Sequence, residues 1–182
     1  MRIEPIEKTD KTGRRVLLRS PEVADAAEMI RYLKTTSGET PYLIRDPDEI
    51  SVSPELEGEF LYQRLEAERE CMIVAVVDSE IAGTCTVMKA EPHRRAAHRC
   101  EIGIALYQAF TGCGIGRILM DHALTLAKAF GYEQAELQVA SGNKPAIGLY
   151  QSLGFQQYGV LPRNMKYQDG SYADMLWMMK VL

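Results

Sequence analysis

The sequence predicts a mixed α/β domain in which helices cover both faces of one sheet. Residues 71–77 (CMIVAVV) form an uninterrupted apolar run, and after a short turn residues 81–88 return as its hairpin partner. Between residues 101 and 161 strand-like and helix-like patterns then alternate, beginning and ending with a strand. Hairpin strands followed by alternating strands and helices therefore predict a mixed sheet.

The N-terminal segment is expected to be a lead-in to this domain. Residues 1–13 are polar and predict a flexible segment, whereas residues 14–19 (RRVLLR) are a plausible first strand. No linker, repeat or low-complexity tract follows, and 182 residues are enough for one sizeable core. We therefore expect a single domain over residues 14–182.

Two helices are expected before the first hairpin. Ser20-Pro21 is typical of an N-cap followed by proline at the first helical position, and this helix should end within residues 35–38. Ser53-Pro54 repeats the pattern and begins a second helix that reaches about Arg69. The stretch between these helices is irregular and acidic, which indicates a solvated charged face or a surface that attracts cationic ligands.

The C-terminal part should complete the sheet. Residues 134–140 are strand-like, residues 143–153 form a short helix, and residues 155–161 and 171–181 are two further strands. Asp169-Gly170 is a good hairpin turn between the last two strands.

Composition limits the classes of function. A net charge of −4 argues weakly against a nucleic-acid partner, and no apolar run is long enough to cross a membrane. The N-terminus lacks the apolar core of a secretory signal, so a cytoplasmic location is expected. The cysteines have no metal-ligand spacing, and three of the four lie in strand-like runs as small core residues.

The stretch from Glu101 to Phe130 carries the most specific local signal. An apolar strand is followed by glycines at 112, 114 and 116, and from Ile115 onwards apolar residues repeat with helical spacing. Glycines at a helix start allow close approach of a ligand and leave backbone N–H groups unpaired. The pattern predicts a phosphate site at a strand–helix junction.

Two segments at a characteristic spacing resemble the GCN5-related N-acetyltransferase (GNAT) superfamily. Thr111 to Gly116 (TGCGIG) is similar to its acyl-CoA signature Q/R-x-x-G-x-G/A, with Thr111 in place of Arg or Gln. Asn143 to Phe155 resembles the later N-x-x-A-I-x-L-Y-x-x-x-G-F run. The resemblance covers roughly residues 14–182. It implies a central, mostly antiparallel sheet of about seven strands flanked by about four helices.

The resemblance also implies acetyl-CoA as co-substrate and assigns its contacts. The backbone of Ile104 and Leu106 would pair with the pantetheine arm, amides from Gly112 to Arg117 would hold the pyrophosphate, and Asn143 would bond the pantetheine region. The residues carried over as cofactor contacts are Ile104, Ala105, Leu106, Thr111, Gly112, Cys113, Gly114, Ile115, Gly116, Arg117, Asn143 and Tyr150.

Tyr150 is the candidate general acid. The resemblance would place it near the CoA sulfur, and a phenol is a neutral donor at pH 7 that can protonate a leaving thiolate. The alternative is a core tyrosine with a satisfied hydroxyl, because Tyr150 shares a helix face with Ala146 and Leu153.

Glu101 and His98 are the candidate bases. Glu101 lies on the side of its strand that carries Gly103 and Ala105, and it resembles the glutamate that some members use to take the proton of the amine. His98 should begin the same strand on the opposite face and titrates near neutral pH. The alternatives are a Glu101 paired with Arg99 or Arg94, and a solvated His98 at the edge of a loop.

The sequence therefore predicts an enzyme that transfers an acetyl group from acetyl-CoA to a primary amine of a small molecule, amino acid or peptide. Transfer would occur by direct attack in a ternary complex, without a metal. The alternatives are a non-catalytic acyl-CoA-binding module and an enzyme for a longer acyl-CoA. A homodimer through the last strands is a further expectation.

Overall fold

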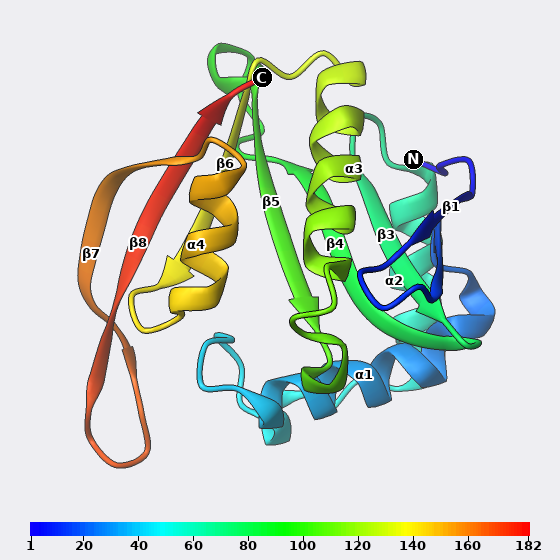
Figure 1. Cartoon of the computed structure of the whole chain (residues 1–182), viewed down its shortest axis with the longest axis horizontal. Coiled ribbons are helices and arrows are strands. Elements are labelled where there is room, and N and C mark those ends of the chain that lie inside the picture. The colour runs from blue at the N-terminus through cyan, green and yellow to red at the C-terminus, as the bar shows by residue number, and fades with distance from the viewer.

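The computed structural model describes residues 1–182 and contains one eight-stranded sheet with strand order β1-β2-β3-β4-β5-β6-β8-β7 (Figure 1). All neighbouring strands are antiparallel except β5 and β6, which are parallel. The strands are β1 (Ile6–Thr9), β2 (Arg15–Arg19), β3 (Cys71–Val77), β4 (Glu80–Lys89), β5 (Arg99–Leu106), β6 (Gln134–Ala140), β7 (Gln156–Lys166) and β8 (Tyr172–Val181). This confirms the mixed, mostly antiparallel sheet predicted from the sequence.

Four α-helices cover the two faces of the sheet. They are α1 (Ala26–Glu39), α2 (Pro54–Glu66), α3 (Ile115–Ala129) and α4 (Lys144–Ser152). Helices α3 and α4 pack on one face over a core of 25 buried residues, and α1 packs on the other face over a smaller core around Tyr32. None of these helices combines the length and the apolar character needed to span a bilayer.

The burial of side chains along α3 confirms the helix that the apolar periodicity predicts. Ile115, Leu119 and Ala123 have no exposed surface, and all three belong to the main core. Burial of such apolar stripes contributes roughly 1.5–3 kcal/mol per large side chain. The resulting anchorage fixes the N-terminus of α3 beside the end of β5.

The N-cap prediction holds for α2 but is wrong for α1. Ser53 Oγ accepts a hydrogen bond from the Leu56 amide at 3.3 Å, as an N-cap does. Ser20 is instead buried, and its hydroxyl accepts a hydrogen bond from the Ile3 amide at 2.9 Å. Helix α1 therefore begins only at Ala26, after a short 3₁₀ turn.

The expectation that residues 1–13 form a flexible lead-in is wrong. Residues 6–9 form the edge strand β1, which pairs with β2 along its whole length. Asp10 closes the connecting turn, because its carboxylate accepts hydrogen bonds from Thr12 and Arg14. Burial alone would raise the pKa of Asp10, but these hydrogen bonds outweigh it and lower the pKa to about 2. The segment thus belongs to the folded domain.

The sheet opens between β5 and β6. Only three residue pairs join the two strands, from Arg99 with Gln134 to Glu101 with Glu136. Beyond Glu101, β5 remains paired with β4, and β6 remains paired with β8. Figure 1 shows the two strands diverging from this junction, with α3 on the β5 side of the gap and α4 on the β6 side.

The last strand in the sheet, β7, forms an edge with exposed apolar side chains. Tyr158, Val160 and Leu161 are each more than two-fifths exposed. Such an edge is available for pairing with another chain. The homodimer through the last strands stays a prediction.

Candidate active site

The gap between β5 and β6 presents unpaired backbone groups. The hydrogen bonds from Ala90 N to Arg99 O and from Tyr107 N to Ala82 O fix the phase of the β4–β5 ladder. Odd-numbered residues of β5 therefore direct their backbone groups towards β4. Ile104 and Leu106 direct theirs into the gap, where no strand pairs with them. An extended ligand can add to this edge as a strand would.

A run of free amides borders the same gap. No backbone amide from Gly112 to Arg117 donates a hydrogen bond to the protein. Gly114 is the N-cap of α3, with φ of +92°, and no side chain caps the helix. Unpaired amides at the N-terminus of a 15-residue helix form a site for an anion such as phosphate.

The side chain of Thr111 turns away from this run of amides. Its Oγ1 donates to Gln108 O at 2.8 Å, within the 3₁₀ turn that precedes the glycines. Cys113 is a partly exposed free thiol, and its carbonyl accepts a hydrogen bond from Lys11 N at 2.9 Å. The turn after β1 therefore supports the segment from Gly112 to Arg117, which we call the anion loop. A flexible segment at residues 1–13 would not make this contact.

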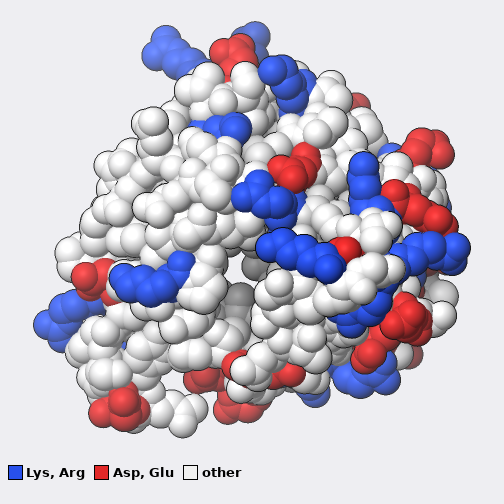
Figure 2. All heavy atoms as spheres, in the orientation of Figure 1, with Lys and Arg blue, Asp and Glu red and all other residues white.

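Basic side chains surround the anion loop. The side chain of Lys11 lies against Gly114, and Arg14 stacks over Phe110 with 5.3 Å between the guanidinium carbon and the ring centroid. Arg117 donates a hydrogen bond to Ser152, which links α3 to α4. Figure 2 shows a hollow near the middle of this face, with Lys and Arg side chains gathered on the side of the anion loop. The charge around the loop suits a polyanionic ligand.

Asn143 begins α4 on the other side of the gap. Its Oδ1 accepts a hydrogen bond from the Ala146 amide at 3.3 Å, so the side chain acts as the N-cap of the helix. This bond leaves the side-chain nitrogen of Asn143, Nδ2, available to another partner. A contact between Asn143 and a ligand stays a prediction.

Tyr150 is buried, yet its hydroxyl has no partner in the protein. The residue is 6% exposed, and its ring packs against Phe155 with 6.1 Å between the two ring centroids. Burial raises the pKa of Tyr150, and no hydrogen bond to its hydroxyl contributes. The hydroxyl is not among the fully buried polar atoms that lack a partner, so it keeps some contact with solvent although the ring is buried. Its role as the general acid stays a prediction.

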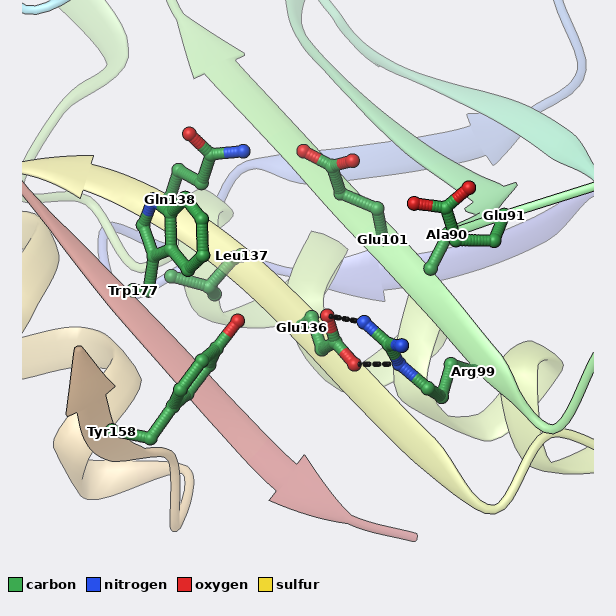
Figure 3. A pocket seen from close by; sticks show the side chains of 9 residues that line it. All are labelled: Ala90, Glu91, Arg99, Glu101, Glu136, Leu137, Gln138, Tyr158 and Trp177. Carbon is green, nitrogen blue, oxygen red and sulfur yellow. Dashed lines mark hydrogen bonds and ion pairs between the residues drawn. The ribbon is translucent and has the colours of Figure 1, made fainter. Parts of the chain in front are cut away.

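Glu101 lies on the face of the sheet opposite to α3 and α4, and it lines a cavity of about 190 Å³. Figure 3 shows Glu101 and Glu91 on one side of this cavity and Tyr158 and Trp177 on the other. Glu101 is half-buried and forms no ion pair or hydrogen bond with another residue. Its pairing with Arg99 or Arg94, considered from the sequence, does not occur.

Arg99 pairs instead with Glu136, the neighbour of Glu101 on β6. Its Nη2 donates to one carboxylate oxygen of Glu136 at 2.8 Å, and its Nε donates to the other. The hydrogen bonds from Arg99 lower the pKa of Glu136. Burial raises the pKa of Glu101, and the nearby charge of Glu136 raises it further. Two carboxyl groups whose pKa values move apart are typical of an acid–base site.

His98 lies outside this arrangement. It is an exposed residue of the turn before β5, and its carbonyl accepts hydrogen bonds from Glu133 and Gln134. The strand begins at Arg99, so the expectation that His98 begins it is wrong. His98 does not line the cavity.

Several cavity residues were not identified from the sequence. Glu136 and Gln138 alternate with buried apolar residues of β6, and this polar alternation in a central strand was the available signal. Trp177 is placed by its pairing with Gln138 in register, which no local pattern indicates. No three side chains of His, Cys, Asp or Glu are grouped so that they could hold a metal ion.

A sheet that opens beside a glycine-rich helix start without a side-chain cap offers a site for an extended, phosphate-bearing ligand. The Acetyltransferase (GNAT) family has a sequence profile that matches residues 36–155. The chain therefore belongs to the GNAT family of acetyltransferases.

Relatives and solved structures agree with this assignment. A streptothricin acetyltransferase of Streptomyces lavendulae is 30% identical over 118 residues, which are 63% of this chain and 61% of that protein. An acetyltransferase of the GNAT family from Streptococcus pneumoniae has a TM-score of 0.86 and 28% identity, covering 92% of this chain and 99% of that one. A phosphinothricin acetyltransferase from Sinorhizobium meliloti in complex with AcCoA shares the fold, with a TM-score of 0.80 and 18% identity over 92% of this chain and 88% of that one.

Proposed function

We propose that this protein is an N-acetyltransferase that transfers the acetyl group of acetyl-CoA to a primary amine of a small molecule or peptide. The observation that carries the proposal is the gap between β5 and β6, where the unpaired edge of β5 lies beside the free amides that begin α3. The S. lavendulae relative is named for an acetyl transfer, and the S. meliloti structure contains AcCoA. Both support acetyl-CoA as the co-substrate here.

The residues that border the gap fit this ligand. The amides from Gly112 to Arg117 would bind its pyrophosphate, and Lys11 would add charge attraction, whereas the charge of Arg14 is paired with Asp10. The free edge of β5 at Ile104 and Leu106 would pair with its amide-bearing arm. When bound, acetyl-CoA supplies a thioester-activated acetyl group.

Two side chains would handle the protons. Glu101 would accept the proton of the acceptor amine, directly or through a water molecule, because an amine attacks only in its neutral form. Tyr150 would hold its phenolic proton close to the sulfur end of the arm and donate it to the departing thiolate, which is released as the free CoA thiol. A positioned acid or base contributes roughly 10²–10⁴-fold to a rate.

The test is release of free CoA thiol from acetyl-CoA in the presence of amines, amino acids and short peptides. We expect turnover with at least one class of amine and none without an amine. Tight calorimetric binding of acetyl-CoA with no turnover on any amine would indicate a non-catalytic binding module instead. Faster turnover with a longer acyl-CoA would revise the donor and leave the reaction class unchanged.

A further inference from the structure

Resting on the proposed function, we infer that the cavity beside Glu101 receives an acceptor that carries a second, positively charged group a few bonds from its reacting amine. The cavity lies at the junction where β5 and β6 are still paired, and β7 and β8 complete its wall through Tyr158 and Trp177. Its volume of about 190 Å³ is below the roughly 300–1,000 Å³ of pockets that enclose whole ligands. It therefore holds the amine-bearing end of an acceptor whose remainder lies outside.

The charges of the cavity select against an anionic acceptor. Its lining contains Glu91, Glu101 and Glu136 but only one basic residue, Arg99. The charge of Arg99 is matched by Glu136 through two hydrogen bonds. A carboxylate on the acceptor would find no uncompensated cation here and would face Glu91 and Glu101 across a small space. An α-amino acid held by its carboxylate is therefore a poor fit.

The aromatic wall suits a cation. The rings of Tyr158 and Trp177 contact each other with 6.0 Å between their centroids, and both side chains remain more than a third exposed. Figure 3 shows them facing the acidic side chains across the cavity. A cation held against an aromatic face gains about 0.5–1 kcal/mol at an exposed site. The wall therefore offers apolar contact to an alkyl chain and attraction to a charged group.

The two unpaired carboxylates, Glu101 and Glu91, have different roles. Glu101 is half-buried on β5 and takes the proton of the reacting amine, which is then neutral. Glu91 is exposed at the rim, in the loop that follows β4, and carries no ion pair. A second amine a few bonds from the first would remain protonated and lie between Glu91 and the aromatic rings. The chemical class that fits is a linear diamine or an amine with a cationic tail.

Three acceptors with the same reacting group test this inference. They are 1,5-diaminopentane, pentylamine and 5-aminopentanoate, whose tails are positive, neutral and negative. At low ionic strength we expect kcat/KM for the diamine to exceed that for pentylamine by about tenfold and that for the amino acid by about a hundredfold, since rim charges act through attraction and repulsion. Added salt should reduce both ratios.

A matched pair of variants locates the effect. Glu91→Gln should lower kcat/KM for the diamine by about two- to fivefold and so reduce its advantage over pentylamine. Glu59→Gln, an exposed change on α2 outside the cavity, should leave the ranking of acceptors unchanged. Equal rates for the three acceptors, or a preference for 5-aminopentanoate, would overturn the charge inference alone. Absence of turnover with every amine would overturn the proposed function as well.

Discussion

Glu101 and Glu136 lie opposite each other on neighbouring parallel strands, yet their pKa values move in opposite directions. Burial without a hydrogen bond raises the pKa of Glu101, and the Arg99 guanidinium lowers the pKa of Glu136. The pair therefore separates a carboxyl group that can exchange a proton from one that stays ionised. This relationship leads to predictions on stability, on pH dependence and on activity.

The two carboxyl groups should affect stability with opposite sign. A raised folded-state pKa means that ionised Glu101 opposes folding above that pKa, so Glu101→Gln should raise Tm by about 1–2 °C at pH 7.5. A lowered folded-state pKa means that Glu136 stabilises the fold above its unfolded pKa, and this stabilisation is lost as the pH falls through the folded value. Glu136→Gln should therefore lower Tm at pH 7.5. Thermal unfolding followed by circular dichroism measures both, and a lower Tm for Glu101→Gln would contradict the account.

Glu101→Gln should also reduce turnover by about 10²–10⁴-fold, because glutamine cannot accept the proton of the amine. Activity would be lost while stability is retained, which separates a catalytic role from a structural one. The measurement is kcat for thiol release with saturating acetyl-CoA and one fixed amine. A variant with wild-type kcat would remove Glu101 from the proposed mechanism.

The pH profile should respond to Glu136. Activity falls at low pH as Glu101 becomes protonated, and its raised pKa places this limb above the usual range of a glutamate. The charged and titratable groups in the cavity with Glu101 are Glu91, Arg99, Glu136 and Tyr158. Glu136→Gln removes a nearby negative charge and releases Arg99, so the acidic limb should move to lower pH. Since the same amine is used for both proteins, its own titration cancels, and an unmoved limb would argue against Glu101 as the base.

Tyr150→Phe and Tyr32→Phe form a matched pair of hydroxyl deletions. The hydroxyl of Tyr32 donates to Ala105 O at 2.7 Å, whereas that of Tyr150 has no partner in the protein. We expect Tyr150→Phe to keep its stability and acetyl-CoA affinity but to lose at least tenfold in kcat. Tyr32→Phe should lose about 1 kcal/mol of unfolding free energy. Denaturant titration and calorimetry distinguish the two, and full activity of Tyr150→Phe would exclude it as the general acid.

Local patterns predicted the elements that have a strong periodicity of their own. The apolar stripe of α3 and the uninterrupted run of β3 both lie where the sequence places them, because burial of their side chains determines their conformation. Strand β1 (IEKT) has no such pattern and owes its conformation to backbone pairing with β2 and to the turn at Asp10. A polar segment that is ordered by its neighbours carries little signal in its own residues.

The candidate site was likewise predictable only where it depends on local features of the sequence. The free amides follow from the glycine spacing and from the helix that begins at Ile115, which are both local features. The pairing of Arg99 with Glu136 depends on the register of two strands that are far apart in sequence, so Glu101 could equally have been assigned to Arg99. The aromatic wall depends on the position of β7 and β8 beside β6, which is a property of the sheet order.

Alanine substitutions at two glycines with similar backbone conformation distinguish a loss of ligand binding from the effect of backbone strain. Gly112 in the anion loop has φ of +76°, Gly131 after α3 has φ of +80°, and a Cβ on either would meet no atom within 4 Å. Alanine at either position should therefore lower the unfolding free energy by a similar amount, about 1 kcal/mol, through backbone strain. Only Gly112→Ala should weaken acetyl-CoA binding, by about tenfold or more, because its methyl group and shifted amides disturb the site for the pyrophosphate. Calorimetric Kd values for acetyl-CoA measure this difference, and equal affinities for the two variants would show that the amides after Gly112 do not hold the phosphates.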